Sequence, residues 1–464
     1  MEQIKKVIAA FLVISIIVSN CPASVLAMDA DDSQKSVSED RTIQQDLKTD
    51  SNPEESQDTY VIEEVTEESS FNGRDSEEDV SSEQNDGQIL IQSQEGEFNY
   101  TVLNGTYCEI TGYSGTAEAV TIPSEISGYI VQSIADNAFK DNTTLTTVVF
   151  PETIETMGAS AFSGCTKLED VRLNIGLTNI SRYAFYGCKS LESMTFPDTV
   201  TEIDYDAFSE CSGLKTVNLP EGLKSIKSYA FQNCTSLESI DIPDSVEKMS
   251  ARAFYNCAKL SEVGYPLSWT VTCDYYDNSD TSYSEGSSYY SSPFEGCSAL
   301  TKIEIPEGVT SIPKYAFRGV TGLKEVVLPE SLTNISVYAF EGCSGLGRIQ
   351  FNEGLKQICG YAFEGCSALK KVVFNNELKT IYAYAFNECS GLNEVTFNKG
   401  LKTIYGYVFA GCIGLKEVSI PDTITEIDIG TFEGCTGLET VNLPEGLKSI
   451  KSYAFQNCTS LESI

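Results

Sequence analysis

Twelve of the sixteen cysteines recur at one fixed place in the chain, three residues after a phenylalanine. Regularly spaced thiols can form disulfides, bind a metal ion or act as nucleophiles. The sequence contains no histidine, which removes Ser-His-Asp and Cys-His activation and every His-ligated metal site. An enzyme would then need paired carboxylates or a Ser-Lys pair in a pocket, and the repeat builds no such pocket. We therefore expect no enzyme activity, no catalytic residues, no cofactor and no metal. The twelve positions are Cys165, Cys188, Cys211, Cys234, Cys257, Cys297, Cys343, Cys366, Cys389, Cys412, Cys435 and Cys458.

Repeat geometry favours one state for these thiols. Equivalent side chains in stacked repeats point in parallel about 4.8 Å apart, whereas a disulfide needs Cβ atoms roughly 3.8 Å apart that face each other. Val320 occupies the same position in one repeat, so a small apolar side chain satisfies it. No Cys-x-x-Cys pair occurs. The sequence predicts buried, reduced thiols, with disulfides and metal binding as the less favoured alternatives.

Tyrosines form a second pattern, two residues before the phenylalanine. The pattern is unbroken at Tyr315, Tyr338, Tyr361, Tyr384 and Tyr407. Half-buried packing along a turn is the favoured interpretation, and an amphipathic contact strip is the alternative.

A tyrosine-rich insertion follows Trp269, the only tryptophan. Its Tyr, Ser, Gly and Asp content is typical of adaptable binding loops, and insertions in repeat arrays often lie on the binding face. A flexible loop without a partner is the equally weighted alternative. The candidate contact residues in it are Tyr275, Tyr276, Tyr283, Tyr289 and Tyr290.

Polar and charged residues alternate with apolar ones eight and ten residues after each phenylalanine. Alternation of this kind places them on the solvent face of a strand, where they vary in charge and size from repeat to repeat. We predict partner contacts there, although any solvated strand face would also be polar. The candidates are Lys302, Glu304, Arg348, Gln350, Lys371 and Glu394.

The elements that position these residues follow from a 23-residue period. Leu stands six residues after every repeat Phe, and further apolar residues follow, as in Leu214-x-x-Val217-x-Leu219. Each unit therefore predicts one short strand and a short helical or 3₁₀ turn around Ala-Phe-x-x-Cys, and stacking buries their apolar faces. The expected fold is an α/β repeat solenoid, a curved rod with a concave parallel β-sheet. The repeat Phe residues stand at 139, 162, 185, 208, 231, 254, 294, 317, 340, 363, 386, 409, 432 and 455, so one step of 40 contains 17 extra residues.

The first 97 residues predict export and a spacer. Residues 1–27 have the basic start, apolar centre and small-residue cleavage site of a signal peptide, and a lipoprotein signal at Cys21 is the less favoured alternative. Residues 28–97 hold 22 acidic against 4 basic residues, so we expect them to be disordered. The formal charge of −36 argues against nucleic-acid binding. No later stretch is long and apolar enough to span a membrane.

The motif Ala-Phe-x-x-Cys-x-x-Leu-x-x-Val-x-Leu-Pro-x-Gly-Leu-x-x-Ile, complete from Ala207 to Ile226, resembles the BspA-like (Treponema pallidum-type) leucine-rich repeats of surface proteins. The resemblance covers residues 98–464, with an N-terminal capping unit at 98–133 and the array at 134–464, interrupted at about 272–290. It implies adhesion or protein–protein contact.

We therefore expect a secreted or cell-surface binding module, adhesin-like, for a protein or surface glycoconjugate. The alternative is a passive spacer or targeting array of a larger secreted protein. Val441–Ile464 repeats Val217–Ile240 letter for letter and stops inside a strand, so we also expect that the natural chain continues further.

Overall fold

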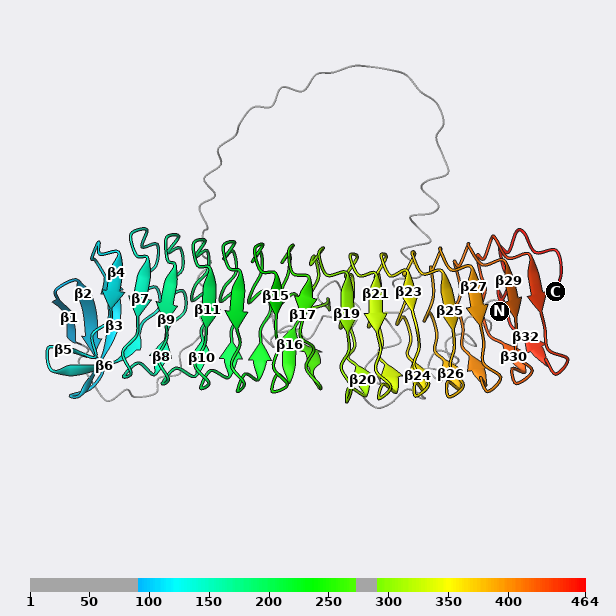
Figure 1. Cartoon of the computed structure of the whole chain (residues 1–464), viewed down its shortest axis with the longest axis horizontal. Coiled ribbons are helices and arrows are strands. Elements are labelled where there is room, and N and C mark those ends of the chain that lie inside the picture. The colour runs from blue at the N-terminus through cyan, green and yellow to red at the C-terminus, as the bar shows by residue number, and fades with distance from the viewer. Residues whose placement is uncertain (1–90, 273–289) are drawn as a thin grey trace, which may run out of the picture.

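The computed structural model describes residues 91–272 and 290–464, which form a rod of stacked coils (Figure 1). Each coil contributes a strand to each of two parallel rows. Neighbouring strands pair with a shift of one repeat, as where Ser193 lies opposite Thr216. Equivalent residues of successive coils therefore lie directly beside each other. The stacked solenoid with parallel strands expected from the 23-residue period is present, but each coil contributes two strands where the sequence analysis predicted one.

The first row, here called the major row, contains β4 and, after it, the strands that begin eight residues after the repeat Phe residues from Phe139 to Phe432. Its members are β4 (Ala119–Thr121), β7 (Thr147–Val149), β9 (Asp170–Arg172), β11 (Ser193–Thr195), β13 (Thr216–Asn218), β15 (Ser239–Ile240), β17 (Glu262–Val263), β19 (Lys302–Glu304), β21 (Glu325–Val327), β23 (Arg348–Ile349), β25 (Lys371–Val373), β27 (Glu394–Thr396), β29 (Glu417–Ser419) and β31 (Thr440–Asn442).

The second, minor row contains shorter strands formed by the apolar pair late in each repeat. Its members are β8 (Thr156–Met157), β10 (Asn179–Ile180), β12 (Glu202–Ile203), β14 (Ser225–Ile226), β16 (Lys248–Ser250), β18 (Thr270–Thr272), β20 (Ser311–Ile312), β22 (Asn334–Ile335), β24 (Gln357–Ile358), β26 (Thr380–Ile381), β28 (Thr403–Ile404), β30 (Glu426–Ile427) and β32 (Ser449–Ile450).

Five further strands close the N-terminal end of the rod: β1 (Ile91–Glu95), β2 (Phe98–Val102), β3 (Tyr107–Tyr113), β5 (Glu125–Ile126) and β6 (Tyr129–Ile134). The first three pair antiparallel, and β3 then pairs in parallel with β6, which continues into the minor row through β8. The structure thus starts at β1, inside the acidic segment that the sequence assigns to disorder. Residues 1–90, with the proposed signal peptide, lie outside the described residues.

The sequence analysis predicted helical or 3₁₀ turns around the repeat Phe, and this prediction is wrong, because no described residue is helical. The residues two before and two after each repeat Phe are left-handed in nearly every coil, as at Asp206 (φ 52°) and Glu210 (φ 64°). A helix cannot continue through such residues. Some backbone amides of this segment instead donate to the next coil, and others close a turn within their own coil. The Phe208 amide donates to the Ala230 carbonyl of the next coil at 2.7 Å, and the Cys211 amide donates to the Phe208 carbonyl at 3.2 Å.

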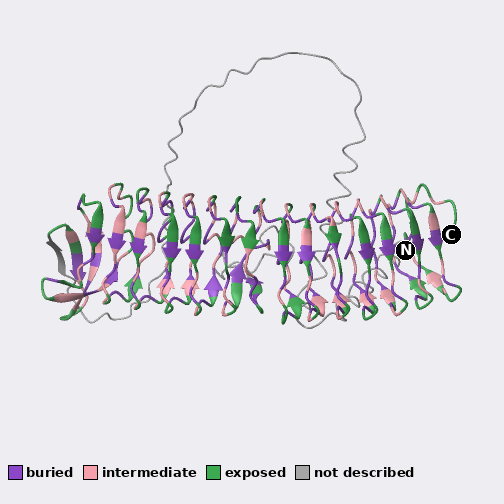
Figure 2. Cartoon of the chain, viewed as in Figure 1, coloured by how far each residue is buried: buried purple, intermediate pink, exposed green. Residues whose placement is uncertain are grey.

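The core is a set of ladders that run the length of the rod. The fourteen repeat Phe rings stack on one another, with centroids 4.7 to 6.1 Å apart. Along the major row, exposed and buried residues alternate, as Figure 2 shows. The apolar middle residue of each strand packs beneath the rings, so no coil buries its core without a neighbour.

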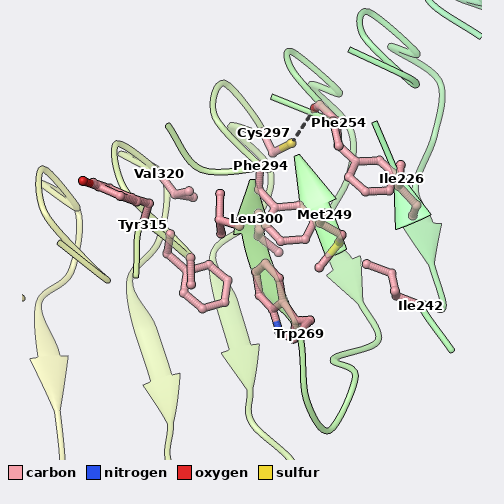
Figure 3. Packing of buried hydrophobic residues seen from close by; sticks show 14 of the residues in the cluster. Ile226, Ile242, Met249, Phe254, Trp269, Phe294, Cys297, Leu300, Tyr315 and Val320 are labelled. Carbon is pink, nitrogen blue, oxygen red and sulfur yellow. Dashed lines mark hydrogen bonds between the residues drawn. The ribbon is translucent and has the colours of Figure 1, made fainter. Parts of the chain in front are cut away.

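The core widens where the repeat is interrupted. The widest ring spacing, 6.1 Å, lies between Phe294 and Phe317. Tyr265 and Trp269, at positions that are aliphatic or Phe in the other coils, fill this space and are 9% and 5% exposed. Figure 3 shows Trp269 beside Phe294. The described residues stop at Thr272 and resume at Tyr290, on either side of the 17 extra residues.

The cysteine prediction is confirmed for the described part of the chain. Its cysteines are free thiols, and all are buried except the half-buried Cys458. Each of the twelve repeat thiols donates to the carbonyl of the Phe one coil earlier, at 3.1 to 3.3 Å, as Cys297 does to Phe254 in Figure 3. Burial raises the pKa of the Cys165 thiol to about 12. A thiol kept protonated in this way is a poor nucleophile and a poor metal ligand.

Candidate binding surface

The outer side of the major row presents one continuous exposed surface, here called the strand face. It consists of the first and third residues of each major-row strand, such as Thr216 and Asn218 of β13, which are exposed while Val217 between them is buried. The strands lie in register, so these side chains form two straight files along the rod. A rigid backbone thus holds them at a fixed spacing of roughly 4.8 Å between coils.

All six strand residues proposed as contacts lie on this surface and are exposed. Lys302 and Glu304 come from β19, Arg348 from β23, and Gln350 follows β23 directly. Lys371 on β25 and Glu394 on β27 continue the file. The structure therefore brings these residues together over five successive coils.

The charges on the strand face are paired with one another, which the sequence interpretation missed. Arg348 bonds Glu325 of the preceding coil at 2.8 Å, and Lys371 bonds Glu394 of the following coil at 2.5 Å. Lys302 pairs with Glu304 of its own strand. The two ion pairs between coils could have been predicted from the sequence, because their opposite charges stand one repeat of 23 residues apart. Exposed pairs of this kind contribute between about 0 and 1 kcal/mol, so they leave the surface free to exchange partners.

The insertion contributes one described residue, Tyr290; Tyr275, Tyr276, Tyr283 and Tyr289 lie outside the described residues. The Tyr290 ring stacks on Tyr315 at 5.2 Å, and its carbonyl accepts a hydrogen bond from Arg318 at 2.6 Å. These contacts belong to the turns that carry the repeat Phe. The structure thus places Tyr290 at the end of the stacked tyrosines, next to Tyr315, and does not bring it to the strand face.

The tyrosine pattern is a packed ladder, as the favoured interpretation predicted. From Tyr290 through Tyr407, six rings stack with centroids 4.7 to 5.2 Å apart. Tyr315 is buried and the others are half-buried. Burial is the largest cause that raises the pKa of Tyr338, Tyr361 and Tyr384. These tyrosines therefore stabilise the turns and offer only ring edges and hydroxyls to a ligand.

Carboxylates flank this ladder one residue after the repeat Phe. Arg318 pairs with Glu341 at 2.5 Å, and Asn387 donates to Glu364 at 2.6 Å. Burial raises the pKa of Glu364 to about 8, and repulsion from Glu341 and Glu388 adds to the rise. The described ranges contain no group of three or more side chains suited to hold a metal ion. They also contain no helix long and apolar enough to cross a membrane.

The repeat region matches the family model described as the BspA type leucine-rich repeat region, in six copies, over residues 131–270, 287–416 and 361–464. A search of curated proteins gives no significant match to the chain.

Solved structures of bacterial leucine-rich repeat proteins share the architecture. A leucine-rich repeat protein from Bacteroides ovatus matches with 24% identity and a TM-score of 0.54, over 80% of this chain and 93% of that chain. A leucine-rich cell surface protein from Faecalibacterium prausnitzii matches with 27% identity and a TM-score of 0.41, over 81% and 95%. The pneumococcal vaccine antigen PcpA matches with 19% identity and a TM-score of 0.46, over 82% and 99%. The first of these likenesses supports the fold.

Proposed function

The chain belongs to the BspA-type leucine-rich repeat family, and from that premise we propose that it is an extracellular, adhesin-like binding module. The strand face recognises a macromolecular partner, a protein or a surface glycoconjugate. The observation that carries the proposal is the row of exposed and half-buried side chains on in-register parallel strands. A surface of this kind is rigid before binding, so little conformational entropy is lost on association.

The composition of the strand face changes along the rod, which supports selective recognition. Strands β11 to β15 present mainly Ser, Thr and Asn, whereas each strand from β19 to β29 presents Lys, Arg or Glu at its first position. The third position of these strands is mostly uncharged and includes the exposed Val327 and Val373. Charges of both signs at fixed spacing discriminate partners by complementarity more than they raise affinity. The neutral stretch and the charged stretch would contact different parts of one extended partner.

The localisation part of the proposal rests on residues 1–27. Their signal-peptide pattern supports a secreted or cell-surface protein. The acidic segment before the rod would act as a solvated spacer.

A passive spacer or targeting array remains the second candidate function. The ion pairs within the strand face favour it, because charges that already pair with each other need no partner. The two functions differ in what surface substitutions do.

Binding of the full chain to immobilised host matrix and bacterial surface proteins separates them. For a partner found in this way, Arg348→Glu combined with Lys371→Glu should weaken binding at least tenfold and slow association more at low than at high salt. Lys356→Glu combined with Lys402→Glu is the matched control, because these two exposed lysines outside the major row give the same change in net charge. Unchanged binding of both variants, or the absence of any partner, would support the spacer.

Deletion of residues 274–288 tests the insertion separately. We expect an almost unchanged melting temperature, because the core ladders continue across the interruption with Phe254 and Phe294 at 5.5 Å. Binding should weaken at least tenfold if the tyrosines of the insertion act as anchors. A deletion variant that binds every partner as tightly as the parent would show that the insertion is only tolerated.

A further inference from the structure

A hollow lies away from the strand face, on the turns that follow β10, β12, β14 and β16. It has a volume of about 450 Å³ and opens between residues two before and one after the repeat Phe. This volume falls within the range of roughly 300 to 1,000 Å³ typical of small-molecule sites. Its lining is Tyr183, Tyr186, Asp206, Tyr229, Gln232, Arg252 and Tyr255.

The hollow exists because a short side chain interrupts a file of tyrosines. In the C-terminal half, tyrosines of five successive coils stack closely and leave no gap. Here Tyr183 and Tyr229 stand two coils apart, with Asp206 in the coil between them. At roughly 4.8 Å per coil, the two tyrosine positions are about 10 Å apart, with a carboxylate between them.

Aromatic rings form the two ends of the hollow. Tyr183 and Tyr186 meet edge to face with centroids 5.9 Å apart, and Tyr229 and Tyr255 do the same at 6.2 Å. Tyr183 is 37% and Tyr186 38% exposed, which is unusual in a rod whose other ladder tyrosines are mostly packed. Each end therefore offers solvent-accessible ring surface.

The polar groups of the hollow select against an anion. The Arg252 guanidinium is already engaged, since it bonds Glu295 at 2.6 Å and the Tyr229 hydroxyl at 3.2 Å, and lies over the Tyr255 ring at 5.4 Å. Asp206 is 7% exposed; its burial raises the pKa of that carboxyl to about 6, and a hydrogen bond from Tyr183 opposes the rise. A carboxylate has two oxygens with several lone pairs, so Asp206 can accept further hydrogen bonds from hydroxyl donors. Half-buried Gln232 adds an amide that both donates and accepts.

We propose that this hollow binds a neutral saccharide, whose ring stacks on Tyr186 and whose hydroxyls bond Asp206 and Gln232. A sugar ring has an apolar C–H face that suits an aromatic ring and hydroxyls that suit a carboxylate and an amide. A phosphate, sulfate or carboxylate would meet Asp206 without a free cation to offset it. The hollow and the strand face are separate surfaces, so the site does not depend on the proposed function.

A glycan array probed with the full chain, followed by calorimetry with the neutral sugars that it identifies, tests the proposal. Tyr186→Ala and Asp206→Asn should each weaken binding at least tenfold. Tyr453→Ala is the control for Tyr186→Ala, because Tyr453 is also an exposed tyrosine of the turns, at 52%, and lies outside the hollow. It should leave the affinity unchanged. Melting temperatures check that each variant is folded.

The proposal is overturned by three outcomes. One is an array without any bound neutral glycan. Another is a preference for sialylated or sulfated glycans over their neutral counterparts. The third is equal affinity of the folded Tyr186→Ala variant and the parent chain for the neutral sugar.

Discussion

Cys234 and Cys458 should react with an alkylating reagent at very different rates, although their sequence surroundings are identical. Val217–Ile240 and Val441–Ile464 agree at all 24 positions, so only the neighbours in space differ. Cys234 lies between two described coils and is fully buried, whereas Cys458, in the last coil of the 464-residue chain, is half-buried. Comparing the two cysteines therefore measures how much one neighbouring coil protects a thiol from the reagent.

The expected ratio of the two alkylation rates follows from the contacts that must break to expose each thiol. To expose Cys234, its coil must also leave the following coil, which breaks the ring contact of Phe231 with Phe254 at 5.2 Å. An aromatic pair contributes about 1 kcal/mol, and exposing the fully buried Phe231 costs about 2 kcal/mol more. Each 1.4 kcal/mol corresponds to a factor of ten, so Cys234 should react about a hundredfold more slowly.

Timed alkylation of the native chain at pH 8, followed by tryptic digestion and mass spectrometry, measures both rates. The peptide after Lys227 continues to Lys248, and the peptide after Lys451 ends at Ile464, so the two have different masses. In denaturant both cysteines should react alike. Equal rates in the native chain would refute the idea that stacked coils protect the thiols.

Three further results are expected. Phe363→Ala should lower the free energy of unfolding in denaturant by about 3 to 5 kcal/mol, and Phe455→Ala by less, because Phe455 is only half-buried. The pKa of Glu364 is raised from 4.5 to about 8, so its neutral form stabilises the fold fully below about pH 4.5, and this stability is lost as the pH rises to 8. Glu364→Gln should therefore remove a fall in melting temperature over that window, and an unchanged pH profile would contradict the assignment. Arg348→Ala should change the unfolding free energy by less than about 1 kcal/mol, since its pair with Glu325 is exposed; a larger loss would show that the pair stabilises the rod.

The fold could be predicted to the level of the coil, because one period fixes every equivalent position. Val320 in the cysteine position showed that the slot is apolar, and the structure buries it. The path of the chain within each coil was harder to predict from the sequence. The pair Ser225–Ile226 forms a strand because Glu202–Ile203 lies beside it, and a two-residue strand has no periodicity of its own to detect.

The missing helix had a partial signal. Gly187 and Asn233, two residues after a repeat Phe, are types that tolerate left-handed backbone. Tyr229, two residues before one, adopts the same conformation without any such preference, so its geometry is set by the neighbouring coils. The sequence also contains the residues that form the hollow on the turns, with Asp206 at the repeat position between Tyr183 and Tyr229. That these residues enclose a hollow can be seen only in the stacked coils.

Contacts between nearest neighbours also determine how the rod responds to force. In both rows, the described strands pair only with strands of adjacent coils, so tension applied at the two ends meets no bond that spans several coils. Each coil advances the rod by roughly 4.8 Å but contains 23 residues of chain, which extend to about 78 Å. Pulling should therefore release coils one at a time from an end, with long steps of similar size, and the rod would lengthen more than tenfold before the last coil opened.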